Sequence, residues 1–260
     1  MLLVLGVSSL GGGFWWLDQK VSLSTDPIDI TGVGTSVNQV IFKTDGVLTN
    51  RWFGNWFGPM RSRTLMQLDI SNIRKELEAE PQVEQARVRR QYPSSLVVEI
   101  KEKQPVLVLR LRAKNNGFQD WMVADDGSLY LGTGYPTATL SLLPSLSIKP
   151  SLLRLNPDGA GYSKLDGIPS VAPLLALARK DHPGLYRDWQ IVSYERPDQS
   201  DPGAHVLVRS GKVSSIRFAP NNYKAQMQRL KYLLMEPDFR KKNRIESIDL
   251  SHDRSVYAKI

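Results

Sequence analysis

Cysteine is absent from the 260 residues, which excludes structural disulfides, thiolate nucleophiles and cysteine-based zinc sites. Histidine is scarce, and the three, His182, His205 and His252, lack the spacing of a metal site. No G-x-S-x-G segment occurs, and GVGTSV at 32–37 lacks the third glycine and the Lys-Ser/Thr pair of a phosphate-binding loop. We therefore predict that the chain is not an enzyme and that it binds no cofactor, no metal and no small-molecule substrate.

The chain has fewer acidic than basic residues. It contains 26 Asp and Glu and 34 Lys and Arg, which gives a net charge of +8. Such a balance favours contact with anionic surfaces but selects no single class of partner. Two basic clusters, at 86–91 and 238–244, raise the question of nucleic-acid binding. Neither comes with a recognition-helix pattern or an aromatic RNA-binding pattern, so we predict no nucleic-acid partner.

Long apolar runs are also missing, with one exception at the start of the chain. Residues 1–17 carry no charge, and a spanning helix needs about 20 apolar residues. Trp15 and Trp16 stand where an aromatic belt marks a membrane–water boundary. We predict that residues 1–20 form all or most of a single transmembrane helix, with a cytoplasmic tail missing before it. The alternative is a signal peptide, although a basic n-region and a small-residue cleavage site are lacking.

The first part of the remaining chain mixes strand and helix signals. Residues 28–33 read as a strand, and residues 36–44 as a short helix or an extended segment. Residues 45–64 contain glycines, a proline and two Trp-Phe pairs, which predicts a long aromatic loop. That loop would lie against a membrane or a partner, or its aromatics would pack on the domain's own core. Residues 68–81 predict a short helix that Asp69 caps.

A hairpin follows this helix. Residues 82–91 and 95–103 read as two strands around a Tyr-Pro-Ser turn, and the second strand alternates apolar and charged side chains. The alternation places the arginines of the first strand on a polar face. The apolar residues of the first strand do not alternate perfectly with polar ones, which predicts a bulge.

Beyond residue 105 the sequence becomes rich in strands. The strand candidates are PVLVLRL, WMVADDGSLYL, WQIVSYER, HVLVRSG and SSIRFAP. Helices are predicted at 171–180 and 221–235, and a last strand pair at 247–250 and 255–260. Strands with a few helices predict an α+β fold in two parts, divided near residue 105.

The helix and hairpin at 68–110 resemble the POTRA segment of the bacterial cell-division family FtsQ/DivIB. The matching positions are Pro81 and Val83, then Ala86, Val88, Arg90, Pro93 and Leu96, then Glu102, Pro105 and Val106. WMVADDGSLY at 121–130, LPSL at 143–146 and IDLSHDRSVYAKI at 248–260 are similar to later family motifs. Ser251 departs from the pattern, because an arginine is usual at its position.

The resemblance implies an architecture of three parts: a transmembrane helix at 1–20, a POTRA-type α/β sandwich domain at 21–105 that includes the loop 45–64, and a mixed β-sheet domain with flanking helices at 106–260. It also implies a non-enzymatic, single-pass scaffold of the divisome, the cell-division machinery. The protein would sit in the bacterial inner (cytoplasmic) membrane at the division septum, with most of the chain on the periplasmic side.

The partners that the resemblance implies are single-span division proteins of the FtsB/FtsL (DivIC/FtsL) kind. They would bind by β-strand addition at the edge of the C-terminal sheet. The expected contact residues are Ser255, Val256, Tyr257, Ala258, Lys259, Ile260 and Tyr223. A helix face with Lys224, Arg229 and Lys231 would attract an acidic partner. Alternatively, the last strand is an interior strand or a disordered tail.

A different function stays open. Transport and envelope-assembly components also carry POTRA domains, usually as a repeated series. This sequence shows one such segment, which favours the division scaffold.

Overall fold

The computed structural model describes residues 28–29, 37, 39–60, 62–112, 117–157, 161–195, 203–252 and 255–260. The chain divides into two compact units, residues 1–103 and residues 104–260. The membrane helix predicted at 1–20 lies outside the described residues. Among the helices that are described, none is both long and apolar enough to span a membrane.

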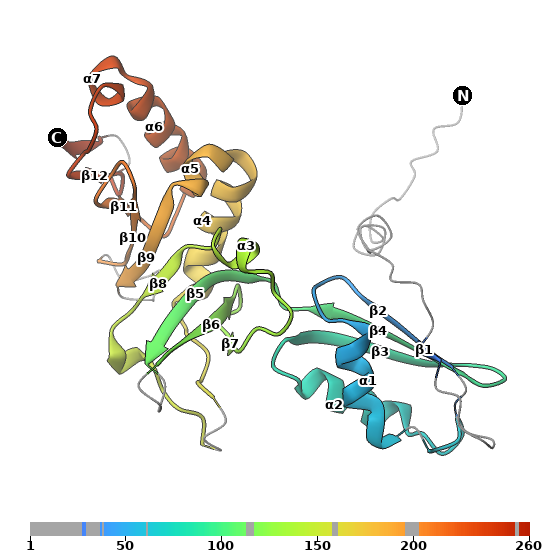
Figure 1. The fold of residues 1–260 in the computed structure, drawn as a ribbon. Helices are drawn as coiled ribbons and strands as arrows, with labels where there is room; N and C mark the ends of the chain where they lie inside the picture. Colours follow the sequence, from blue (N-terminus) through green and yellow to red (C-terminus); the bar gives the residue numbers. More distant parts are fainter. Residues whose placement is uncertain are drawn as a thin grey trace, which may run out of the picture. The chain divides into compact units, whose positions relative to one another are not determined.

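The first unit is a four-stranded sheet with two helices on one face (Figure 1). Its strands are β1 (Ile28–Asp29), β2 (Gln39–Thr44), β3 (Val83–Gln91) and β4 (Ser95–Glu102), in the order β1-β2-β4-β3. The central pair β2 and β4 is parallel, and the outer pairs are antiparallel. The segment 36–44, for which the sequence allowed helix or strand, is therefore the strand β2.

Helix α2 (Ile70–Ala79) confirms the helix predicted from the sequence. Asp69 caps it, because its Oδ1 accepts hydrogen bonds from the backbone N–H groups of Ser71 (2.9 Å) and Asn72 (3.1 Å). Ile73 and Leu77 are buried against the sheet. The hairpin is confirmed too, and the predicted irregularity is a register shift near the start of β3.

The loop predicted at 45–64 is wrong, because this segment contains helix α1 (Asn50–Phe57) and the 3-10 turn η2 (Gly58–Met60). Thr49 caps α1 by accepting a hydrogen bond from the N–H of Trp52 at 3.2 Å. Phe53 and Phe57 are fully buried, and Phe53 stacks on Phe42 of β2 with ring centroids 4.8 Å apart. The structure therefore confirms the alternative prediction, in which the aromatic side chains pack on the domain's own core.

The second unit is built on a nine-stranded mixed sheet in the order β13-β12-β11-β10-β9-β8-β5-β6-β7. The bounds are β5 (Pro105–Arg112), β6 (Phe118–Ala124), β7 (Leu129–Tyr130), β8 (Ser145–Ser147), β9 (Trp189–Glu195), β10 (His205–Ser210), β11 (Ile216–Phe218), β12 (Ser247–Asp249) and β13 (Tyr257–Lys259). The strands predicted after residue 105 are confirmed, while the short β8 was not predicted.

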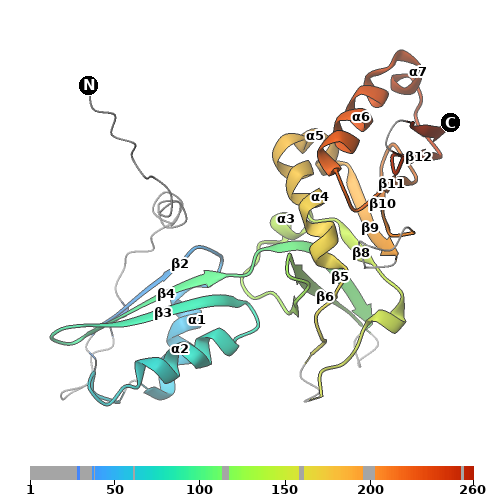
Figure 2. The ribbon, with the colours of Figure 1, turned by 180° about the vertical axis from the view of Figure 1, so that it is seen from behind.

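Two long helices, α4 (Ile168–Asp181) and α6 (Tyr223–Met235), cover one face of this sheet (Figure 2). Their apolar residues join those of the strands in one core, which confirms both predicted helices. The remaining helical segments, which were not predicted, are α3 (Thr137–Leu140), α5 (Pro183–Arg187), α7 (Pro237–Arg240) and the 3-10 turn η3 (Pro150–Leu152). A smaller cluster around Met122 and Tyr130 lies on β5–β7 with Tyr135, Leu140 and Leu143.

The turn between β6 and β7 makes the stability of the second unit dependent on acid pH. Burial raises the pKa of Asp126, but hydrogen bonds from Lys164 and Ser128 outweigh it and lower the pKa to about 2. A carboxylate with a depressed pKa stabilises the fold above its unfolded pKa, near 4, and this contribution disappears as the pH falls toward 2.

We therefore expect Asp126→Asn to lower the free energy of unfolding by about 1 kcal/mol at pH 7, since the ion pair is partly solvent-screened. The difference from the natural chain should vanish near pH 2. Urea unfolding followed by circular dichroism at several pH values measures it. Asp125→Asn, at the exposed neighbouring position, serves as the control. A difference that stays constant with pH would contradict the prediction.

Candidate functional site

The last strand, β13, lies at the end of the nine-stranded sheet. It pairs with β12 in an antiparallel register, with Ser247 opposite Lys259, Ile248 opposite Ala258 and Asp249 opposite Tyr257. In the part of the chain that the structure describes, no strand pairs with its other side. This strand is therefore a sheet edge, with main-chain groups on its outer side available for pairing.

The orientation of the main chain shows which residue presents these groups. The N–H of Ile248 donates to the carbonyl of Ser215, on the side of β12 that faces β11. Since Ala258 stands opposite Ile248, this pair is not hydrogen-bonded, and the N–H and C=O of Ala258 point away from β12. Ala258 is thus the residue at the middle of β13 that a further strand would pair with.

The side chains of the last six residues divide between the core and the surface. Val256 packs against the main core of the unit, whereas Tyr257 and Ile260 are 61% and 53% exposed. The ring of His252 meets the ring of Tyr257 edge-on at a centroid distance of 5.1 Å. Lys259 forms an ion pair with Glu246 at 2.8 Å. The edge therefore combines one partly buried anchor, Val256, with two apolar side chains open to a partner.

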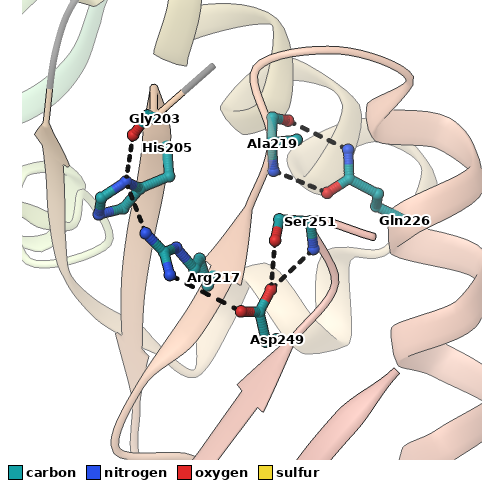
Figure 3. A network of polar contacts seen from close by, with 7 residues as sticks. All are labelled: Gly203, His205, Arg217, Ala219, Gln226, Asp249 and Ser251. Atoms are coloured by element: carbon teal, nitrogen blue, oxygen red, sulfur yellow. Dashed lines mark hydrogen bonds and ion pairs between the residues drawn. The ribbon is translucent and has the colours of Figure 1, made fainter. Parts of the chain in front are cut away.

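A polar network lies next to the edge, on the strands behind it (Figure 3). Asp249 Oδ1 accepts hydrogen bonds from the N–H (2.9 Å) and the hydroxyl (2.6 Å) of Ser251. Arg217 stands between Asp249, at 3.8 Å, and His205, at 3.1 Å. Ser251, the departure from the family motif, thus fixes the carboxylate of the residue that faces Tyr257 across the strand pair.

The network also determines the charge of Asp249. Partial burial raises the pKa of its carboxyl group, but the hydrogen bonds from Ser251 and the charge of Arg217 outweigh that effect. The pKa therefore lies below its ordinary value, and Asp249 is negatively charged at neutral pH. Arg217 stays beside a permanent countercharge.

Helix α6 holds the segment between β12 and β13 in place. The guanidinium of Arg229 donates to the carbonyl of Leu250 at 3.1 Å and to the carbonyl of His252. Arg229 was predicted to lie on the exposed basic face, and the structure instead gives it this clamping position. Lys224 and Lys231 are exposed on α6 as expected.

Tyr223 is not a surface residue. It is 9% exposed at the start of α6, and its hydroxyl donates a hydrogen bond to the carbonyl of Ser170 at 2.7 Å. Burial raises the pKa of Tyr223 well above its ordinary range. We correct the expectation for this residue: it joins α6 to α4 and does not reach a partner at the edge.

Gln226 is a second buried residue that the sequence did not single out. Its side chain accepts a hydrogen bond from the N–H of Ala219 at 2.9 Å and donates to the carbonyl of Ala219 at 3.1 Å (Figure 3). This double contact attaches α6 to the end of β11. Together with Arg229, it fixes the helix against the strands that carry the edge.

The fold and the edge define a class of protein: an α/β module of POTRA type joined to a separate mixed sheet with a free terminal strand. A comparison with family models identifies the module. Residues 57–103 match the POTRA domain, FtsQ-type. The chain therefore contains an FtsQ-type POTRA domain, and the resemblance to the FtsQ/DivIB family is confirmed for this segment. No curated protein matches the chain.

The FtsQ-type POTRA domain is typical of cell-division scaffolds, and this family is generally non-enzymatic. Among the described residues, no group of His, Asp and Glu side chains could hold a metal ion. His205 takes part in the polar network and His252 packs on Tyr257, so two of the three histidines have structural contacts near the edge.

Proposed function

We propose that this chain is a non-enzymatic scaffold of the bacterial division machinery, and that it binds a partner by β-strand addition at β13. The observation that carries the proposal is the outward main chain of Ala258 on a free sheet edge, in a chain with an FtsQ-type POTRA domain. An added strand would continue the antiparallel or parallel ladder and satisfy the unpaired N–H and C=O groups.

The proposed partners are single-span division proteins of the FtsB/FtsL (DivIC/FtsL) kind. A basic surface near the edge supports an acidic partner segment. Its exposed members on α6, α7 and the loop that follows are Lys224, Lys231, Arg240, Lys241, Lys242 and Arg244. Such a surface would speed the encounter with an acidic segment more than it would tighten the final complex.

The energetics of a short edge favour a complex with several contacts. Each main-chain hydrogen bond adds about 1 kcal/mol net, so a strand the length of β13 gives modest affinity by itself. Tyr257 and Ile260 would add apolar contact area at the two ends of the strand. Membrane anchoring of both proteins at the division septum, with their folded parts on the periplasmic side, would raise the effective concentration.

A pull-down of the full chain with the soluble parts of the host's FtsB/FtsL-like proteins tests the proposal. A chain that ends at residue 254 serves as the comparison. We expect binding by the full chain and its loss in the shortened one. Binding that survives would keep the scaffold and move the interface away from β13. No binding by the full chain would contradict the division role and favour a POTRA-bearing transport or envelope-assembly component.

A further inference from the structure

A group of apolar side chains is exposed at one end of the first unit. Met66 is 70% exposed, and Tyr92, in the turn between β3 and β4, is 69% exposed. The hydroxyl of Tyr92 donates to Met66 Sδ at 3.7 Å, and Pro93 beside it is exposed as well. Single exposed apolar residues are common on protein surfaces, whereas a contiguous group indicates a contact site. We call Met66, Tyr92 and Pro93 the apolar tip.

The fold holds Met66 in this exposed position. Leu65 and Leu68, on either side of it, are buried in the core of the first unit. The guanidinium of Arg90 donates to the carbonyl groups of Leu65, at 2.9 Å, and Leu68, at 2.6 Å. These contacts fix the segment on β3 and leave the side chain of Met66 outward. A partner surface would therefore meet a preformed site, which lowers the entropy lost on binding.

The apolar tip lies close to the first strand of the unit. Asp29 of β1 stands opposite Gln39 of β2, and Gln39 stands opposite Ser95, which follows the turn of the tip. Figure 1 shows β1 and this turn at the same end of the sheet. Neighbouring strands are about 5 Å apart, so about 10 Å separates β1 from β4 at this position. A surface that adjoins β1 is therefore within reach of the tip.

The sequence before β1 favours a bilayer as that surface. Residues 1–17 carry no charge, and residues 18–27 separate them from β1. A segment of that length extends to at most about 35 Å. The membrane anchoring that is part of the proposed function, on which this inference rests, places a bilayer within this distance of β1.

The charged groups at this end of the unit favour an anionic surface. Arg63 is exposed, and its carbonyl accepts a hydrogen bond from the N–H of Val37, two positions before β2. Asp69 is the carboxylate closest to Met66 in the sequence, and it accepts hydrogen bonds from the N–H groups at the start of α2. Tyrosine is typical of the membrane–water boundary, and arginine is attracted to anionic headgroups. The tip and its surroundings therefore fit the headgroup region of a bilayer.

We propose that the apolar tip rests on the bilayer that anchors the chain. Met66, Tyr92 and Pro93 would lie among the lipid headgroups, and Arg63 would pair with anionic phosphates. The tip would act as a second membrane contact beside the spanning segment. Two contacts fix the orientation of the first unit on the membrane, whereas a single connection leaves the unit free to rotate. The contact would thus determine which surface of the unit faces division partners.

Site-specific labels test this contact, because the absence of cysteine lets each variant carry a single thiol. Ser94→Cys places a fluorophore at the tip. Ala79→Cys places it at the other end of the unit, since the nine residues of β3 separate the two positions by about 30 Å. The labelled full chain is reconstituted into vesicles of phosphatidylethanolamine and phosphatidylglycerol that carry a spin-labelled headgroup quencher. We expect strong quenching of the label at position 94 and little quenching at position 79.

Extraction of the vesicles with alkaline carbonate shows whether the chain is anchored at all. A chain that carbonate removes would overturn both the anchoring and the membrane contact. An anchored chain whose two labels are quenched equally would overturn the contact alone. Neither result decides on the division partners, which the pull-down tests separately.

Variants of the tip measure its contribution. In the Ser94→Cys chain, Met66→Ser combined with Tyr92→Ser should lower the ratio of docked to free tips by about tenfold, since this apolar area no longer enters the bilayer. Arg63→Gln should lower the ratio about fivefold in vesicles with phosphatidylglycerol and leave it unchanged in phosphatidylcholine alone. Phe118→Ser, at an aromatic residue of the second unit that is 75% exposed, is the matched control. Quenching that is unchanged in the tip variants would overturn the inference, and so would protection of the label only after a division partner is added, which would make the tip a protein-binding surface.

Discussion

Replacing Glu102 by alanine is expected to destabilise the first unit by about 3–5 kcal/mol. This carboxylate is fully buried at the end of β4. It accepts hydrogen bonds from the hydroxyl of Thr44 (2.5 Å), the N–H of Leu48 (2.8 Å) and the side-chain amide of Gln82 (2.8 Å). Alanine would leave these donors without their acceptor and would open a cavity beside them.

The surrounding backbone is shaped around the same carboxylate. A Cβ atom at Gly46 would lie 2.2 Å from Glu102 Cδ, so the loop between β2 and α1 closes over the side chain only because residue 46 is glycine. The side chain of Asp45 accepts from the N–H of Glu102 at 2.8 Å, which ties the loop to β4 a second time. Glu102, part of the motif that gave the family resemblance, is therefore a structural acceptor.

Chemical unfolding followed by the indole N–H NMR signals of Trp52 and Trp56 reports on the first unit. Glu102→Gln should cost less than alanine, about 1–2 kcal/mol, because one oxygen still accepts while the new amide faces Gln82. Glu84→Ala, which removes an exposed ion pair with Lys101, is the control and should change the free energy of unfolding by less than about 0.5 kcal/mol. An alanine variant as stable as this control would contradict the prediction.

The elements that could be predicted from the sequence are those with local signals. Asp69 before an apolar helical pattern fixes the start of α2, and the alternation around Val98 fixes β4. Both signals lie within a few residues of the elements that they define. The helices α4 and α6 and the long strands of the second unit follow the same rule.

The segment with helix α1 shows where local signals mislead. Gly54, Gly58 and the following proline argue for a loop, and the helix is too short to be stable alone. It forms because Phe53 and Phe57 reach the core of the first unit, where Phe53 stacks on Phe42 of the preceding strand β2. Tertiary packing outweighs the low helix propensity of glycine here.

The candidate site was predictable in its position along the chain but not in its contacts. Residues 255–260 stood out as a terminal strand. In contrast, Tyr223 bonds to Ser170, 53 residues earlier in the chain, and Arg229 bonds to carbonyl groups more than 20 residues later. The periodicity of α6 places both residues on helix faces, and only the packed fold shows which group each face meets.

Replacing Ala258 by proline is expected to weaken binding of the partner strand by about tenfold or more. Proline has no N–H, and the N–H of Ala258 points outward, away from β12. The substitution therefore removes a donor that the chain itself does not use, and the proline ring would obstruct a strand that approaches this edge. Proline is tolerated on edge strands for the same reason, so the fold should persist.

Ala258→Val is the matched control, since valine keeps the N–H and favours extended backbone. Both variants and the natural chain are titrated with the soluble part of an FtsB/FtsL-like partner, and their unfolding midpoints are compared. Equal midpoints with binding lost only in the proline variant would assign the affinity to the outer main chain of β13. If the proline variant binds the partner as well as the valine variant does, strand addition at this edge is wrong. The proline variant lacks the N–H that strand addition requires, and the valine variant keeps it.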